Sequence, residues 1–181
     1  MSPFATMDGT TLSAGLLVAR VVLGLLMAAH GAQKLFGWFG GHGLAGTGGF
    51  FEQLGFRPGR LFAAMAAGTE FGSGLLVALG LLGPVGSALM LSVMIVAAVS
   101  VHGKNGLFAA ANGIEMPLLY AVGAVALALT GPGLFSLDAA LGISDIWTPA
   151  LVLVVLGVGA IGGIGNLILR RPAPAGAPAG D

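Results

Sequence analysis

Long apolar stretches, separated by short segments rich in glycine, proline or charged residues, dominate the chain. A helix needs about 20 apolar residues to cross about 30 Å of hydrocarbon, because each residue adds about 1.5 Å. Five stretches reach or approach this length, and each ends at polar or turn-forming residues. They predict membrane-spanning helices over residues 12–36, 61–82, 84–101, 114–130 and 147–169.

These spans predict an all-α fold, a polytopic membrane helix bundle with four core transmembrane helices and a fifth C-terminal one. Only Gly83 and Pro84 separate the second span from the third, so we expect these two spans to form an antiparallel hairpin. Residues 1–11 contain no Lys or Arg, so a cleavable signal peptide is not expected. The expected division is a short external N-terminus (1–11), a four-helix membrane domain (12–141), the fifth helix (142–171) and a disordered tail rich in Pro, Ala and Gly (172–181).

Composition indicates that lipid, and not water, surrounds most of the protein surface. Hydrophobic residues make up 56% of the 181 residues and charged residues only 8%, against about 25% in soluble domains. The formal net charge is zero, so nothing indicates nucleic-acid binding. The absence of cysteine excludes disulfides, thiol catalysis and cysteine-ligated iron–sulfur clusters.

The basic residues outside the spans predict the orientation of the protein in the membrane. With five crossings, all six of these residues lie on one side, whereas the loops of the other side contain no Lys or Arg. Cytoplasmic loops collect Lys and Arg, so we expect a multi-pass plasma-membrane protein with its N-terminus outside and its C-terminus in the cytoplasm. The six residues are Lys34, Arg57, Arg60, Lys104, Arg170 and Arg171.

A segment rich in glycine and aromatic residues follows the first span, at residues 37–58. It contains seven glycines before Phe50, and its aromatic side chains are too apolar for a free loop. One interpretation is an interfacial lid or a short amphipathic helix. The other is an ordinary aromatic belt at headgroup depth.

Six ionisable side chains fall inside the predicted spans or at their ends. Charged groups at membrane depth cost at least about 2.5–3.5 kcal/mol by insertion scales, and they usually face the bundle interior. We predict that the six form one polar intramembrane pocket, open to the cytoplasmic side and walled by the first four spans. They are Arg20, His30, Lys34, Glu70, His102 and Glu115.

Helical periodicity predicts which faces of the first two spans point inward. At about 100° per residue, Arg20, Met27 and Lys34 share a narrow stripe with two glycines, and small residues share the face of Glu70. Arg20 is expected about 12 Å below the outer surface, Glu70 about 18 Å and His30 about 27 Å. Side chains lean toward the N-terminus of their helix, so we rank a contact between Glu70 and His30 above one between Glu70 and Arg20.

Structural roles remain open for several of these groups. Lys34 also fits a lysine that snorkels to the interface, and His102 and Glu115 also fit ordinary interfacial residues. Two histidines and two glutamates can ligate a metal, but they lack paired spacing on one helix, so no metal site is expected. Because both histidines fall near the same membrane face, a haem ligated by His30 and His102 is not expected either.

Five short motifs follow one another along the chain: Arg20-Val-Val-Leu-Gly24, His30-Gly-Ala-Gln-Lys34, Glu70-Phe-Gly-Ser-Gly74, Val101-His102 and Ser136-Leu-Asp138. In this order they resemble the signature of the DoxX family of small integral membrane proteins. The resemblance covers residues 12–141 and excludes the fifth span and the tail. It implies a four-helix core in the bacterial plasma membrane.

The resemblance also implies redox chemistry at the membrane. The family is similar to the membrane subunit of thiosulfate–quinone oxidoreductase, and some members resemble partners of superoxide dismutase and a sulfurtransferase in an oxidative-stress complex. We therefore expect an accessory or quinone-interacting subunit of such a complex, with a quinone as ligand and no covalently bound cofactor. A buried carboxylate beside a histidine can supply the proton route that quinone chemistry needs.

Two other functions are consistent with the sequence. A non-enzymatic membrane scaffold would recruit cytoplasmic partners through residues 37–60 and 104–112. A small-molecule transporter would use the buried Glu and Arg groups, although five spans without clear inverted repeats argue against it. The sequence indicates neither an oligomeric state nor whether the protein is catalytic.

Overall fold

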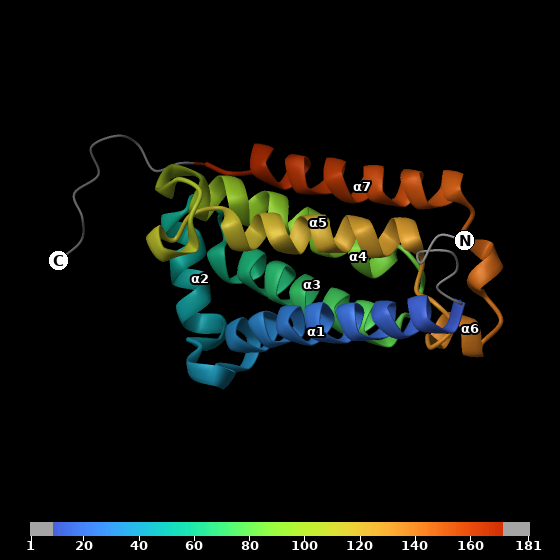
Figure 1. The fold of residues 1–181 in the computed structure, drawn as a ribbon. Coiled ribbons are helices and arrows are strands. Elements are labelled where there is room, and N and C mark those ends of the chain that lie inside the picture. The colour runs from blue at the N-terminus through green and yellow to red at the C-terminus, as the bar shows by residue number, and fades with distance from the viewer. Residues whose placement is uncertain (1–8, 172–181) are drawn as a thin grey trace.

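The computed structural model describes residues 9–171, which fold into a bundle of helices joined by short turns (Figure 1). The expected all-α bundle is confirmed. The expected tail at 172–181 and most of the expected external N-terminus, residues 1–8, lie outside the described residues. The long helices are α1 (Gly9–Phe36), α3 (Gly59–Leu79), α4 (Val85–Ala97), α5 (Glu115–Thr130) and α7 (Pro149–Ile168). The short ones are η1 (Trp38–Gly40), α2 (Gly43–Gln53), η2 (Ala98–His102), η3 (Gly103–Asn105), η4 (Ala109–Ala111), α6 (Leu137–Ala140) and η5 (Ser144–Ile146).

Four helical segments are long and apolar enough to cross a membrane, judged by length and composition: α1, α3, Val85–Asn105 and α7. The remaining expected span, α5, is an apolar helix of 16 residues, shorter than the other four. These helices support a multi-pass integral membrane protein. The predicted helix boundaries agree with the observed ones to within about three residues, except that α4 continues into the π-helix η2.

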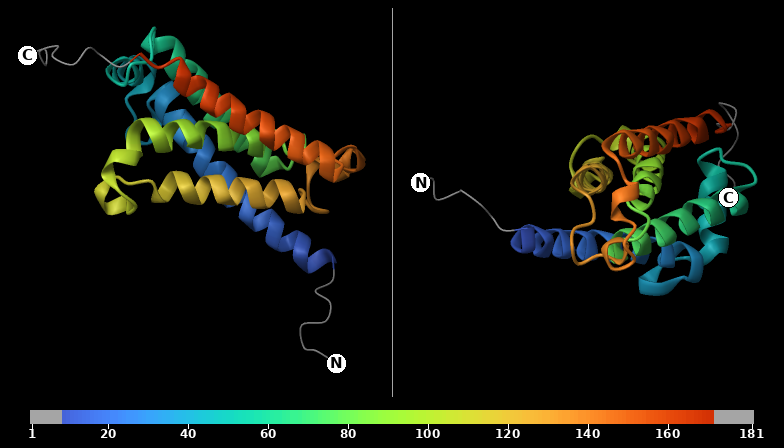
Figure 2. Two further views of the ribbon diagram at one scale, coloured as in Figure 1. Left: turned by 90° about the horizontal axis from the view of Figure 1, so that it is seen from above. Right: turned by 90° about the vertical axis from the view of Figure 1, so that its right-hand side faces the viewer.

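The long helices run back and forth, so that α1 begins and α7 ends at opposite ends of the bundle (Figure 1). We call one end the turn end, which contains the α3–α4 turn and α6, and the other the lid end, which contains α2 and η2. In Figure 1 and in the right-hand view of Figure 2, α1 and α7 lie on opposite sides of the bundle. All six basic residues outside the spans belong to segments at the lid end.

Helices α1 and α3 pack with their backbones almost touching. A Cβ atom added to Gly24 would lie 2.5 Å from the carbonyl oxygen of Gly74, and one added to Gly31 would lie 2.4 Å from the amide nitrogen of Phe71. The predicted inward faces are therefore confirmed, since Gly24, Met27 and Gly31 of α1 are buried against Glu70 and its small neighbours on α3. Small residues allow this approach, which supplies the van der Waals contact that holds helices together in lipid.

Asp138 of α6 organises the turn end. Its side chain is fully buried and accepts hydrogen bonds from the amides of Leu82 (2.8 Å) and Gly83 (2.6 Å) and from Nε1 of Trp147 (2.8 Å). Leu82 has a φ of +60°, a conformation that costs energy for a non-glycine residue. The carboxylate thus joins the tight α3–α4 hairpin, which the sequence predicted, to the start of α7.

Candidate ligand-binding cavity

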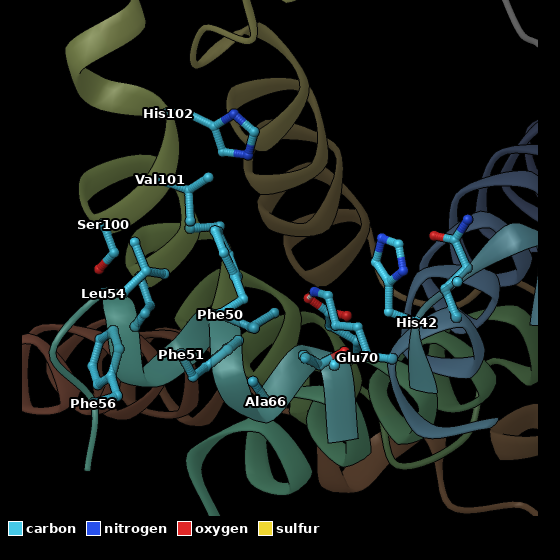
Figure 3. Close-up of a pocket in the computed structure, with 18 of the residues that line it drawn as sticks. His42, Phe50, Phe51, Leu54, Phe56, Ala66, Glu70, Ser100, Val101 and His102 are labelled. Carbon is cyan, nitrogen blue, oxygen red and sulfur yellow. Dashed lines mark hydrogen bonds and ion pairs between the residues drawn. The ribbon is translucent and has the colours of Figure 1, made fainter. Parts of the chain in front are cut away.

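A cavity of about 390 Å³ lies at the lid end between α1, α2, α3, α4 and η2. Its wall is mainly apolar and includes the aromatic rings of Phe50, Phe51 and Phe56. Figure 3 shows Glu70 and His42 on one side of these rings. Ser100, Val101 and His102 lie on the other side (Figure 3). Cavities that bind small organic ligands have this size and this combination of apolar walls with a few polar groups.

Glu70 is the most deeply placed ionisable group of this cavity. Its side chain is only 2% exposed, and its Oε1 atom forms an ion pair with Nζ of Lys34. The second oxygen, Oε2, is buried and has no hydrogen-bond partner among the described residues. A buried carboxylate oxygen without a partner is costly, so this atom is a natural acceptor for a ligand or a water molecule.

The end of α4 changes into a π-helix, η2, where it reaches the cavity. Such turns are rare and are frequently found at functional sites, because they redirect side chains out of the regular helical pattern. Here η2 brings Ser100 and His102 to the cavity wall. The Oγ atom of Ser100 is buried without a partner among the described residues. Nδ1 of His102 lies 2.8 Å from the carbonyl oxygen of Asn112, so in the neutral ring Nδ1 donates and Nε2 remains available as an acceptor.

The glycine-rich segment 37–58 forms η1 and α2, which cover one side of the cavity. A short helix is therefore present, as one of the two sequence interpretations expected. A Cβ atom on Gly41 would lie 2.2 Å from the carbonyl oxygen of Gln33, so a glycine is needed where the chain returns onto α1. The far end of α2 is tied to the end of α7, because Nε of Arg170 donates to the carbonyl oxygen of Leu54 at 2.5 Å.

The structure brings three of the six predicted residues together, since Lys34, Glu70 and His102 all line the cavity. Arg20, His30 and Glu115 lie outside the cavity wall, which corrects the expectation of one pocket for all six. Arg20 lies about 21 Å from Lys34 along α1. It is buried at the turn end, where it donates to the carbonyl oxygen of Phe135.

The expected contact between His30 and Glu70 is also wrong. His30 is exposed and packs edge-on against the ring of Tyr120 at a centroid distance of 5.8 Å. Depth does not separate the two residues, because Gly31, the neighbour of His30, packs against the backbone of Ala67 and Phe71 on either side of Glu70. His30 instead lies on another side of α1, against Tyr120. Glu115 accepts a hydrogen bond from the amide of Ala109 at 2.7 Å and so caps the loop before α5.

Sequence reasoning missed four polar residues of the cavity wall. The π-helix that turns Ser100 inward leaves no readable pattern in the sequence. His42 is the exception, because a histidine within the glycine-rich segment could have indicated a polar site there. The four residues are Gln33, His42, Thr47 and Ser100.

Removal of the Lys34 ammonium is expected to destabilise the protein by about 1–2 kcal/mol, because Glu70 then stays buried without its partner. The cost is moderate because the Lys34 side chain is 32% exposed and part of its solvation is retained. The variant to compare with wild type is Lys34→Met, by thermal unfolding in detergent. The double variant Lys34→Met/Glu70→Gln should recover most of the loss. Equal midpoints for Lys34→Met and wild type would show that the ion pair contributes nothing.

Within residues 9–171, no group of three or more His, Cys, Asp or Glu side chains is placed to hold a metal ion. In a comparison with protein families, the DoxX family model matches residues 15–103 of the chain. That segment contains most of α1 and all of α2, α3 and α4, and therefore most of the cavity wall. No curated protein and no solved structure matches the chain.

Proposed function

Because this chain belongs to the DoxX family and is an integral membrane protein, we propose that it binds a quinone or quinol in the lid-end cavity as a subunit of a membrane redox complex. The observation that carries the proposal is the unpartnered Oε2 of Glu70 in an apolar, aromatic-lined cavity. A quinone ring fits such a wall by stacking and apolar contact, and its polar oxygens need a few placed hydrogen-bonding groups.

The polar groups of the cavity suit the two sides of a quinone ring. When bound, a quinone supplies a carrier that takes up two electrons and two protons at its oxygens. On one side, Glu70 holds or passes a proton, and Lys34 holds the carboxylate in place. On the other side, Ser100 and His102 contribute a hydroxyl and an imidazole to the cavity lining. A carboxylate and an imidazole are the side chains most used for such proton transfer.

The chain has no cysteine, so no thiol of its own can supply the electrons, and we propose that a partner protein supplies them. We propose that soluble redox proteins dock at the lid end, among them superoxide dismutase and a sulfurtransferase. The same basic residues that predict a cytoplasmic position support this end as the docking side. The protein then acts as the accessory subunit through which a partner reaches the quinone pool.

The proposal predicts that Glu70→Gln weakens quinol binding by about tenfold or more, because the hydroxyl of the quinol then loses its charged acceptor. The measurement is quenching of tryptophan fluorescence by added menadiol, the reduced form of menadione, under anaerobic conditions with the purified protein in lipid nanodiscs. Ser100→Ala is a milder second variant on the opposite wall, and it should weaken binding by a few-fold.

Glu115→Gln is the matched control, because it makes the same chemical change in a residue outside the cavity wall. It should bind menadiol as wild type does. If wild type shows no saturable binding, or if both glutamine variants bind equally well, the quinone proposal is wrong.

A further inference from the structure

A second, smaller cavity of about 70 Å³ adjoins the first. The two share part of their walls, so only side chains divide them. Ala66 of α3 stands at this junction, and its side chain is the smallest of the shared ones. The shared residues are Phe51, Phe56, Ala66, Val93 and Val96.

This second cavity, which we call the slot, leads from the lid-end cavity to the outside of the bundle. Its wall comes from α2, α3, α4 and α7, and the last three of these belong to the segments able to cross a membrane. Met65 at its rim is 51% exposed, so the slot opens at a surface that faces lipid. The wall is mainly apolar, with Thr69, Ser92 and Asn166 as the polar members.

We infer that the slot holds the isoprenoid tail of the quinone, and that the ligand enters sideways from the lipid between α3, α4 and α7. The inference rests on the proposed function, because it assigns the tail of the same ligand. The slot is much smaller than the ring-sized cavity beside it, so it suits the start of a flexible chain. A larger groove lies between α4 and α5 and is lined by Ala126 among others. It shares no residue with the main cavity, so it does not offer a second place for the tail of a ligand bound there.

Helix α7, which lies outside the segment matched to DoxX, forms the outer wall of the slot. Two glycines bring it against α4, since a Cβ on Gly159 would lie 2.4 Å from the carbonyl oxygen of Ala88 and one on Gly163 would lie 2.7 Å from that of Ser92. Asn166 follows one turn later and lines the slot. The fifth helix thereby completes a passage that the first four would leave open.

The test compares menadione, which has no tail, with menaquinone-2, which has two isoprenoid units, in nanodiscs. Tryptophan quenching gives each dissociation constant as a mole fraction in the bilayer, so that partitioning into lipid does not contribute. Wild type should bind menaquinone-2 about tenfold more tightly than menadione. Ala66→Phe fills the junction and should remove this advantage while leaving menadione binding within about twofold of wild type.

Thr69→Leu narrows the slot and changes no residue of the main cavity. If Ala66→Phe fails to fold, the affinities of Thr69→Leu for menadione and menaquinone-2 are compared instead. Ala126→Phe, in the groove between α4 and α5, is the matched control and should bind both ligands as wild type does. If a tail gives wild type no advantage, or if both slot variants weaken the two ligands equally, the slot inference is wrong and the quinone proposal stands. If wild type binds neither ligand, both are wrong.

Discussion

Replacement of Gly74 by valine is expected to prevent the bundle from folding. A Cβ atom at this position would lie 2.4 Å from the amide nitrogen of Ala28 and 2.5 Å from the carbonyl oxygen of Gly24. Both are backbone atoms, so no side chain can move aside, and α1 and α3 have to separate. Overpacking usually costs about 1–3 kcal/mol, and a clash of two backbones should cost at least about 3 kcal/mol. Size-exclusion chromatography in detergent should show aggregated Gly74→Val protein.

Gly72→Val provides a control on the same helix. A Cβ atom at Gly72 would meet no described atom within 4 Å, and the same is true of Gly68. Both glycines therefore face away from the described bundle. Gly72→Val should elute as wild type does, whereas a folded, monodisperse Gly74→Val protein would contradict the close α1–α3 packing.

The second large effect is expected from Asp138→Ala at the turn end. The change leaves two backbone amides and the Trp147 indole without their acceptor. Arg20 also loses the nearby negative charge that offsets the burial of its guanidinium. An orphaned buried donor costs about 1–3 kcal/mol, so the summed loss should be about 3–5 kcal/mol. Thermal unfolding in detergent measures this as a lower midpoint.

Asp145→Ala is the matched control, because Asp145 is an exposed acidic residue in the neighbouring turn η5. Its midpoint should stay near that of wild type. Asp138→Asn keeps one acceptor oxygen and should fall between wild type and Asp138→Ala. If Asp138→Ala unfolds at the wild-type temperature, the three hydrogen bonds do not hold the hairpin to α7.

Local patterns in the sequence predict well those features that depend on distance along one helix. The length of each apolar stretch determines whether it can span the hydrocarbon, and the 3.6-residue period determines which side chains share a face. The burial of Gly24, Met27 and Glu70 follows from these two rules alone. The same period places Lys34 on the inward stripe of α1, where it meets Glu70.

Partners between helices are harder to predict, because they depend on how far one helix is shifted along another. The packing of α3 on α1 pairs Glu70 with Lys34 and leaves His30, which lies at nearly the same level, against Tyr120. The role of Asp138 is equally hard to predict. In the sequence it resembles an ordinary loop aspartate, and only the fold shows the three hydrogen-bond donors around it. Neither the shift nor the fold of the loop can be read from the local pattern.

The sequence by itself determined that this protein is an all-α bundle in a membrane, with a carboxylate buried in its second long helix. Hydrophobic length and helical period suffice for this, because lipid requires every backbone polar group to be bonded within its own helix. Only the tertiary structure decided which polar groups meet at the cavity, how the π-helix turns Ser100 inward and where the slot opens. These depend on the offset and close packing of helices distant in the chain, which no single segment encodes.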